Sequence, residues 1–265
     1  MNRVLRLFVA CGCVVASTAF FTTANAQARR AAPAAAPSTA KAAAPVDITG
    51  HWVSLITDDW VYRMITPAKG DVSYVPLNPE GRRVADAWDP ARDEAAGEQC
   101  KGYAAPAIMR LPSHVEITWQ DDNTLKLDID TGMQTRLFHF GQTEPQGARS
   151  WQGWSAASWQ LSGTTEQFYP GPTSLGQIKR AGNLKVDTTN LRAGYLRKNG
   201  VPYSERATFT EHWDVHSLPN GDKYLVNTNV VDDPVYLQAP FQTAIHYKFE
   251  RDTSKWDATP CDARF

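Results

Sequence analysis

Residues 114–130, with the sequence HVEITWQDDNTLKLDID, indicate the fold class of this chain. Apolar Val115, Ile117 and Trp119 alternate with polar residues, and the alternation resumes after a short polar turn. Two runs of period two joined by such a turn are typical of a β-hairpin that buries one face. We therefore expect a mostly β protein in which neighbouring strands are antiparallel.

Similar alternating stretches lie on both sides of this hairpin, and polar turns such as Pro219-Asn220-Gly221 separate them. An open sheet of about ten strands leaves two unpaired edges, and closure removes them. The sequence therefore predicts an up-and-down antiparallel barrel, with a two-sheet sandwich as the alternative. The expected strands are residues 48–57, 60–66, 115–119, 125–129, 133–140, 151–161, 184–191, 205–215, 223–231 and 243–250.

A helical insertion is expected after the second of these strands. Asn78-Pro79-Glu80 combines a capping residue, a proline at the first helical position and an early acid. The stretch up to Gln99 is rich in Ala, Arg and Glu, and Asp89-Pro90 interrupts it because proline disfavours a helical predecessor. We expect this insertion to cover one end of the barrel.

The N-terminal region has the three parts of a secretory signal. Arg3 and Arg6 precede an apolar run, and Ala24-Asn25-Ala26 forms the expected cleavage site. The sequence thus predicts a signal peptide over residues 1–26, an Ala- and Pro-rich disordered linker over 27–45 and a single β-barrel domain over 46–265. The expected location is periplasmic or secreted.

Charge and compartment together exclude several functions. The full chain has 27 Lys and Arg against 28 Asp and Glu, and removing the two signal cations leaves 25 against 28, a net charge of −3. That balance disfavours nucleic-acid binding, and the mature chain has no apolar run long enough to span a bilayer. Export separates the protein from cytosolic ATP and NAD(P)H, so no cofactor is expected.

Cysteine use agrees with export. Cys11 and Cys13 lie within the predicted signal, which leaves Cys100 and Cys261 as the only possible internal pair. An oxidising compartment favours a disulfide between them, with two free thiols as the alternative.

The segment Gly50-His51-Trp52 resembles the opening motif of lipocalin-like (calycin) barrels. The resemblance implies that Trp52 closes one end of the barrel and that a late basic residue, Lys248 or Arg251, packs across it. Residues 191–204, together with Trp151-Gln152-Gly153 and residues 233–237, resemble a group of exported bacterial proteins. That resemblance implies a shared fold and export and carries no functional residues.

Glu211 is the first candidate for chemistry. Period two places it on the same face as Phe209 and Trp213, toward the barrel interior. An inward carboxylate has a raised pKa and suits general acid or base catalysis unless a cation pairs with it. The alternatives are a structural pair with an arginine and a bulge that turns Glu211 outward.

Arg136 and His139 lie on opposite faces of one predicted strand. An inward Arg136 is a natural partner for Glu211 or for a ligand carboxylate, whereas an inward His139 is a candidate for proton transfer. With Tyr195, His139 and Glu211 form the predicted catalytic set.

Nine tryptophans are the remaining signal. An aromatic-walled barrel cavity suits a planar or apolar ligand, although ordinary core packing explains many aromatic residues equally well. The predicted loop over residues 192–204 is either a polar lid over the open end or a packed connection. The predicted ligand-binding residues are Arg136, Trp154, Trp159, Arg197 and Trp213.

Metal binding is not predicted, since the sequence contains no compact pattern of Cys and His ligands. His212 and His216 are four residues apart, a spacing too wide for a strand, and a site assembled across strands stays open. The predicted function is binding of a small apolar or aromatic molecule. The alternatives are a cofactor-independent lyase or isomerase that uses Glu211 and a structural envelope protein with a filled barrel.

Overall fold

A computed structural model describes residues 39–162 and 181–264 of the chain. All of these residues belong to one compact unit. The predicted signal peptide and the first part of the predicted linker lie outside the described residues.

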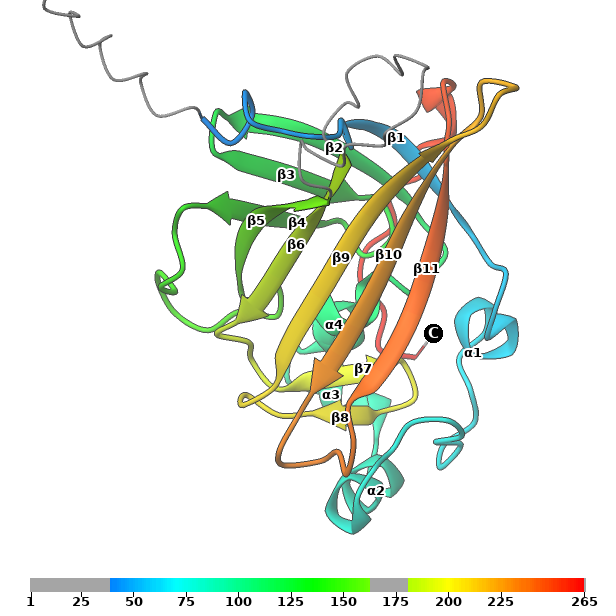
Figure 1. Ribbon diagram of the computed structural model, residues 1–265. Helices are drawn as coiled ribbons and strands as arrows, with labels where there is room; N and C mark the ends of the chain where they lie inside the picture. The colour runs from blue at the N-terminus through cyan, green and yellow to red at the C-terminus, as the bar shows by residue number, and fades with distance from the viewer. Residues whose placement is uncertain (1–38, 163–180, 265) are drawn as a thin grey trace, which may run out of the picture. The chain divides into compact units, whose positions relative to one another are not determined.

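Nine strands close into a barrel in the described part of the chain (Figure 1). Their order around the barrel is β1-β11-β10-β9-β6-β5-β4-β3-β2. Closure confirms the predicted barrel over the sandwich alternative. The strands are β1 Gly50–Leu55, β2 His114–Asp121, β3 Thr124–Ile129, β4 Gln134–Phe140, β5 Trp154–Ser162, β6 Ala181–Thr189, β9 Thr208–Ser217, β10 Lys223–Asp232 and β11 Phe241–Phe249.

The prediction of a purely antiparallel up-and-down order is wrong in two places. Strand β5 pairs with β4 in parallel, because residues 141–153 return along the barrel before β5 begins. Strand β6 pairs with β9, because β7 (Gly194–Arg197) and β8 (Val201–Tyr203) leave the barrel as a separate hairpin. The barrel is therefore mixed.

The helical insertion lies between β1 and β2, not after the second strand. The predicted strand over residues 60–66 is instead helix α1 (Trp60–Met64), where the carbonyl of Asp59 accepts hydrogen bonds from Tyr62 and Arg63. The expected helix over residues 78–99 is confirmed as α2 (Pro79–Asp86) and α3 (Pro90–Ala95), with the predicted interruption at Asp89. The side chain of Asn78 caps α2 by accepting a hydrogen bond from Gly81.

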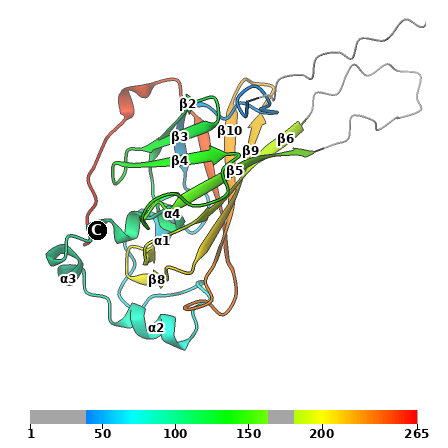
Figure 2. The ribbon, with the colours of Figure 1, turned by 90° about the vertical axis from the view of Figure 1, so that its left-hand side faces the viewer.

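The helices and the small sheet gather at one end of the barrel. Helix α2 contacts β8, and the 3-10 helix Gln99–Tyr103 and helix α4 (Ala105–Ile108) contact β7. Figures 1 and 2 show α2 and α3 toward the lower end of the barrel, and Figure 1 shows the β7–β8 hairpin at the level of the lower ends of β9–β11. Apolar side chains from these elements, such as Leu196 and Tyr203, form a second core together with barrel residues such as Phe209 on β9. The first core fills the barrel and includes Trp52, Trp213 and Tyr247.

The opening motif has a clear packing reason. Trp52 is buried inside the barrel and its ring meets Phe249 edge-on at 5.3 Å. Gly50 has a φ of 127°, and a Cβ there would lie 2.6 Å from the Phe249 ring. Lys248 does not take the predicted place across Trp52: its ammonium lies over Tyr224. The lipocalin resemblance is thus supported only as far as a closed barrel.

Residues 39–45, the described part of the predicted linker, contact the barrel. The Lys41 amide donates to the carbonyl of Asp122, and the Trp159 indole donates to the carbonyl of Ala40 at 2.8 Å. This segment therefore packs against the β2–β3 turn and the inner side of β5.

The C-terminal segment follows the outside of the barrel. The predicted disulfide is confirmed: Cys100 and Cys261 are bonded, with Cα atoms 5.1 Å apart. A short 3-10 helix, Thr253–Lys255, follows β11. Further along, the amide of Thr259 donates to the carbonyl of Asp130, just beyond β3. The disulfide thus fixes the end of the chain to the helical insertion.

None of the helices in the described ranges is long and apolar enough to cross a membrane.

Candidate functional site

Arg136 and Glu211 form an ion pair inside the barrel, where both side chains are fully buried. Arg136 comes from β4 and Glu211 from β9, and the guanidinium donates to both carboxylate oxygens at 3.0 and 2.5 Å. Glu211 lies in regular register with Asn229 on β10 and Val186 on β6, so β9 has no bulge at this position. The structure shows the arginine pair that was one of the sequence alternatives.

Polar groups extend this pair along the interior. Asn227 donates to Oε1 of Glu211 at 2.9 Å, and Asn229 donates to the amide oxygen of Asn227 at 3.2 Å. Thr243 in turn donates to Asn229 at 2.6 Å. A buried carboxylate is stabilised by such donors. A role for Glu211 in proton transfer stays a prediction.

The other two predicted catalytic residues make their contacts elsewhere. His139 is on the outer face of β4, where its ring stacks on Trp154 with centroids 3.9 Å apart. Burial against this ring lowers the pKa of His139. The Tyr195 hydroxyl donates to Asp93 at 2.7 Å, and burial together with that carboxylate raises the pKa of Tyr195. Neither residue has a described contact with Glu211.

The predicted ligand-binding tryptophans are divided between two faces. Trp213 fills the barrel interior and packs on Phe138 and Tyr247. Trp159 lines a pocket of about 380 Å³ beneath residues 41–49, whereas Trp154 lies outside the barrel. These three residues therefore do not line one common cavity.

Arg197, the remaining predicted ligand-binding residue, belongs to a group that we call the arginine cluster: Arg63, Arg110 and Arg197. Arg63 lies in α1, Arg110 follows α4, and Arg197 ends β7. All three are buried, with exposed fractions of 3%, 4% and 3%. Burial lowers the pKa of Arg63 and of Arg197, and the charge of Arg110 adds a smaller lowering to each, so Arg110 lies within electrostatic reach of both.

The Arg197 guanidinium is buried, and no hydrogen-bond partner for it lies among the described residues. Its Nε, Nη1 and Nη2 atoms are all buried and lack any acceptor in the described part of the chain. Its Cζ lies 4.3 Å from the centroid of the Tyr62 ring. Burial, and then the charge of Arg110, lower the pKa of Arg197 to about 10.

The other two guanidiniums are only partly paired. Arg63 donates to the carbonyl of Arg110 at 2.9 Å and to Asp58 at 3.1 Å, and Arg110 donates to Asp59 at 3.0 Å. Nη2 of Arg63 and Nη1 of Arg110 have no acceptor among the described residues. Three cations thus meet two directly bonded carboxylates, and five buried donor atoms point to no described acceptor.

The β7–β8 hairpin fixes Arg197 in place. The predicted lid or connection over residues 192–204 is this packed hairpin, in which Tyr203 is fully buried. The side-chain amide of Asn199 donates to the carbonyls of Ala68 and Asp71, both at 2.9 Å. These hydrogen bonds attach the hairpin, and with it Arg197 at the end of β7, to the segment that follows α1.

A pocket of about 410 Å³ adjoins the cluster. Arg63 and Lys198 contribute cations to its wall, and Met64, Ile65 and Leu111 contribute apolar surface. Burial lowers the pKa of Lys198 to about 8, and its ammonium lies 4.8 Å from the centroid of the Tyr103 ring. The pocket wall therefore combines two cations and the carboxylate of Asp262 with apolar surface.

Sequence reasoning missed Arg63 and Arg110. Residues 60–66 were assigned to a strand, although Asp58 and Asp59 directly before an apolar stretch are a helix-start signal. That signal places Arg63 on a helix but does not bring it to Arg110, which is 47 residues away.

Comparisons of this chain with family models, with curated proteins and with solved structures give no match.

Proposed function

We propose that the protein binds a small molecule through an anionic oxo group, such as a carboxylate, phosphate or sulfate, held by the arginine cluster. The observation that carries this proposal is the buried Arg197 guanidinium, whose three nitrogens have no acceptor among the described residues. The proposal keeps the predicted binding of a small molecule, but its ligand is anionic and its site is formed by the helical insertion and the β7–β8 hairpin instead of an internal barrel cavity.

The physical argument rests on the cost of an unpaired buried cation. Removing a charge from water without a partner costs several kcal/mol, and buried polar groups are therefore almost always hydrogen-bonded. A guanidinium keeps its charge where a lysine loses its proton, so Arg197 needs an acceptor. The planar fork of donors matches two oxygens of one carboxylate or phosphate.

The neighbours of Arg197 favour the same class of ligand. Arg63 and Arg110 each have one further buried donor without an acceptor in the described ranges. Asp58 and Asp59 bond to Arg63 and Arg110, whereas the carboxylate of Asp71 acts on Arg197 only through its charge. A bound anion supplies the hydrogen-bond acceptor that Arg197 lacks among the described residues.

The adjoining pocket suits the body of such a ligand. Arg63 lines the pocket and belongs to the cluster, so an anionic group and an apolar body have adjacent binding surfaces. Met64 and Ile65 are more than half exposed, which leaves apolar surface at the pocket wall for the ligand to cover. The volume of about 410 Å³ is within the range of small-molecule sites.

Thermal unfolding in different salts tests the anion site. Phosphate, sulfate and acetate are compared with chloride at matched ionic strength, since general screening is then constant. We expect saturable stabilisation by at least one oxyanion, about 2.7 kcal/mol at 100 times its Kd. Comparing the three anions separates a carboxylate site from a phosphate or sulfate site.

Arg197→Met is the decisive variant, because methionine keeps apolar volume and removes the charge. In chloride it should be at least as stable as the parent, and it should lose the oxyanion response. Arg206→Met, at an exposed arginine, is the matched control and should keep the response. Equal stabilisation by chloride and all oxyanions, or an unchanged response in Arg197→Met, contradicts the proposal.

A fluorescent aromatic sulfonate, anilinonaphthalene sulfonate, tests the pocket. It should bind with a rise in fluorescence and be displaced by the stabilising oxyanion. Ile65→Ser should weaken dye binding while leaving the oxyanion response intact, because Ile65 is an exposed part of the pocket wall. If neither Ile65→Ser nor Arg197→Met changes the affinity for the dye, the dye binds elsewhere, and the result contradicts the assignment of this pocket.

We further propose that the protein acts in the periplasm or outside the cell, as the signal pattern predicts. The Cys100–Cys261 disulfide supports this location, because disulfides persist in oxidising compartments. Native mass spectrometry of protein purified from that compartment should show a co-purifying anion.

A further inference from the structure

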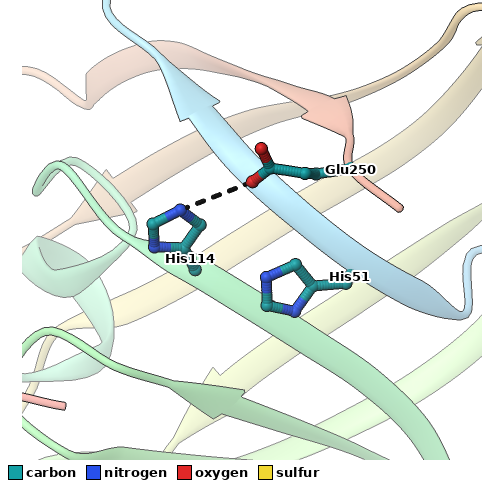
Figure 3. Close-up of side chains that lie close together, drawn as sticks. All are labelled: His51, His114 and Glu250. Atoms are coloured by element: carbon teal, nitrogen blue, oxygen red, sulfur yellow. Dashed lines mark ion pairs between the residues drawn. The ribbon is translucent and has the colours of Figure 1, made fainter. Parts of the chain in front are cut away.

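Three potential metal ligands meet on the outer face of the barrel (Figure 3). His51 lies on β1, His114 on the neighbouring β2, and Glu250 directly follows β11 on the other side. The Glu250 amide donates to the carbonyl of His51 at 2.9 Å. Since Trp52 faces the core, its neighbour His51 faces outward, as side chains alternate along a strand.

The side-chain atoms of this group, which we call the His-His-Glu cluster, are close together. Nε2 of His114 lies 3.5 Å from Oε2 of Glu250, and the rings of His51 and His114 stack with centroids 5.5 Å apart. Each residue offers one ligand atom, and these three atoms all lie within 4.8 Å of one another. Tetrahedral zinc with bonds of 2.0–2.1 Å separates its ligand atoms by about 3.3 Å. Metal binding therefore requires the widest of these separations to close by up to about 1.5 Å.

Two of these atoms have unmet bonding capacity. Nε2 of His51 and Oε2 of Glu250 are buried and lack a hydrogen-bond partner among the described residues. His51 is only 6% exposed, which makes an unpartnered ring nitrogen costly. Lys255 pairs with the other oxygen of Glu250, so Oε2 is the atom left for a further partner.

Asp130 orients the second histidine in the way that metal sites require. Its Oδ2 lies 2.8 Å from Nδ1 of His114, and its Oδ1 accepts the His114 amide at 2.8 Å. Asp130 is 3% exposed and Thr131 donates to it as well. A carboxylate on Nδ1 is the outer partner that histidines in metal sites typically have, and it leaves Nε2 to face the metal.

The C-terminal segment encloses the cluster. Trp256 lies against His51 with ring centroids 5.7 Å apart, and Lys255 reaches Glu250. The Asp257 amide donates to Asp130 at 3.4 Å, which extends the contact between this segment and the barrel. The segment is anchored at its end by Cys261.

We propose that His51, His114 and Glu250 bind one divalent transition-metal ion, with Zn²⁺ as the best match. Two imidazoles and one carboxylate are borderline ligands that suit zinc, whereas Ca²⁺ and Mg²⁺ prefer oxygen alone. Three protein ligands leave the fourth tetrahedral position to water or to a small ligand. This site is separate from the arginine cluster in its residues and its elements.

Metal titration of the full mature chain, purified without a histidine tag and treated with a chelator, tests the proposal. Competition with a chromophoric chelator should give one Zn²⁺ per chain. Co²⁺ at the same site should give the intense visible bands of a tetrahedral complex. His51→Ala and Glu250→Gln should each lower the Zn²⁺ affinity at least 10-fold and weaken these bands.

Two controls separate metal binding from folding. His216→Ala, at an exposed histidine on β9, should leave the affinity unchanged. Asp130→Asn keeps all three ligands and should lower the affinity about 10- to 100-fold through the orientation of His114. Circular dichroism of each apo variant establishes that it is folded before the titration.

Absence of stoichiometric binding to the folded parent, or binding that persists unchanged in His51→Ala and Glu250→Gln, overturns the proposal. Arg197→Met should retain full Zn²⁺ affinity. That variant therefore distinguishes failure of the metal site from failure of the anion site.

Discussion

The guanidinium of Arg136 on β4 donates to both carboxylate oxygens of Glu211 on β9, across the interior of a closed barrel. The two residues are 75 positions apart in the sequence, and both side chains are fully buried. Breaking such a pair leaves a charge without its partner in a medium of low polarity.

We expect Arg136→Met to lower the free energy of unfolding by about 3–5 kcal/mol, because Glu211 stays buried without its cationic partner and loses two hydrogen bonds. The double variant Arg136→Met, Glu211→Met should recover part of that loss. Urea denaturation measures both, with Glu116→Gln at an exposed position as the control. A double variant less stable than Arg136→Met indicates that packing, not charge, sets the cost.

Replacing both cysteines by serine should lower the free energy of unfolding by about 2–5 kcal/mol, since the bond between Cys100 and Cys261 closes a long loop. Hydrogen exchange of residues 253–262 should become faster, because the segment loses its anchor. Reduction of the parent protein should reproduce both effects. Unchanged exchange in this segment means that contacts such as the Thr259 amide with Asp130 hold it without the disulfide.

Lys198 should titrate near its lowered pKa of about 8, far below its ordinary 10.5, because burial disfavours the ammonium. Asp262 raises this pKa, so Asp262→Asn should lower it further. Nuclear magnetic resonance of carbon-labelled dimethyl-lysine measures the midpoint. A midpoint close to 10.5 contradicts the burial of this group.

The same shift predicts a pH dependence of stability. Below pH 8 the ammonium is charged in both states, and its burial penalty is fully present. Between pH 8 and 10.5 the folded state releases the proton before the unfolded state does, so stability rises with pH. The parent should therefore gain stability relative to Lys198→Met across this window in urea denaturation.

Gly200→Ala should be strongly destabilising, by about 2–4 kcal/mol, for two physical reasons. Its φ is 82°, and an added Cβ would lie 2.2 Å from the Trp88 ring. Gly221→Ala is a matched control, since its φ is 88° and no atom lies within 4 Å of the added Cβ. Thermal unfolding should show a much smaller loss in the control. Equal losses in both variants mean that the backbone angle alone sets the cost.

The sequence predicted most of the strands because alternation is a local property. The parity of Glu211 with Phe209 and Trp213 places it inside the barrel, where the structure has it. The same reasoning failed at residues 60–66, where α1 forms a short helix between β1 and β2. A stretch of five residues is too short for its periodicity to distinguish a helical turn from a strand.

The candidate sites were harder to predict than the strands. Of the arginine cluster only Arg197 was among the predicted binding residues, and none of the His-His-Glu cluster was. His51 and Glu250 become neighbours only because β11 pairs with β1 as the barrel closes. No spacing of residues along the chain predicts that these two side chains become neighbours.

The sequence by itself thus determined the β class, the alternation that puts Glu211 on the same face as Phe209 and Trp213, the interrupted helix before Gln99 and the one possible pair of cysteines. Only the tertiary structure decided that β4 and β5 are parallel, that Arg136 meets Glu211, and that three arginines share one buried region. The physical reason is the range of the interactions. Turn chemistry and side-chain alternation act over a few residues, whereas barrel closure and buried charge depend on contacts among segments far apart in the chain.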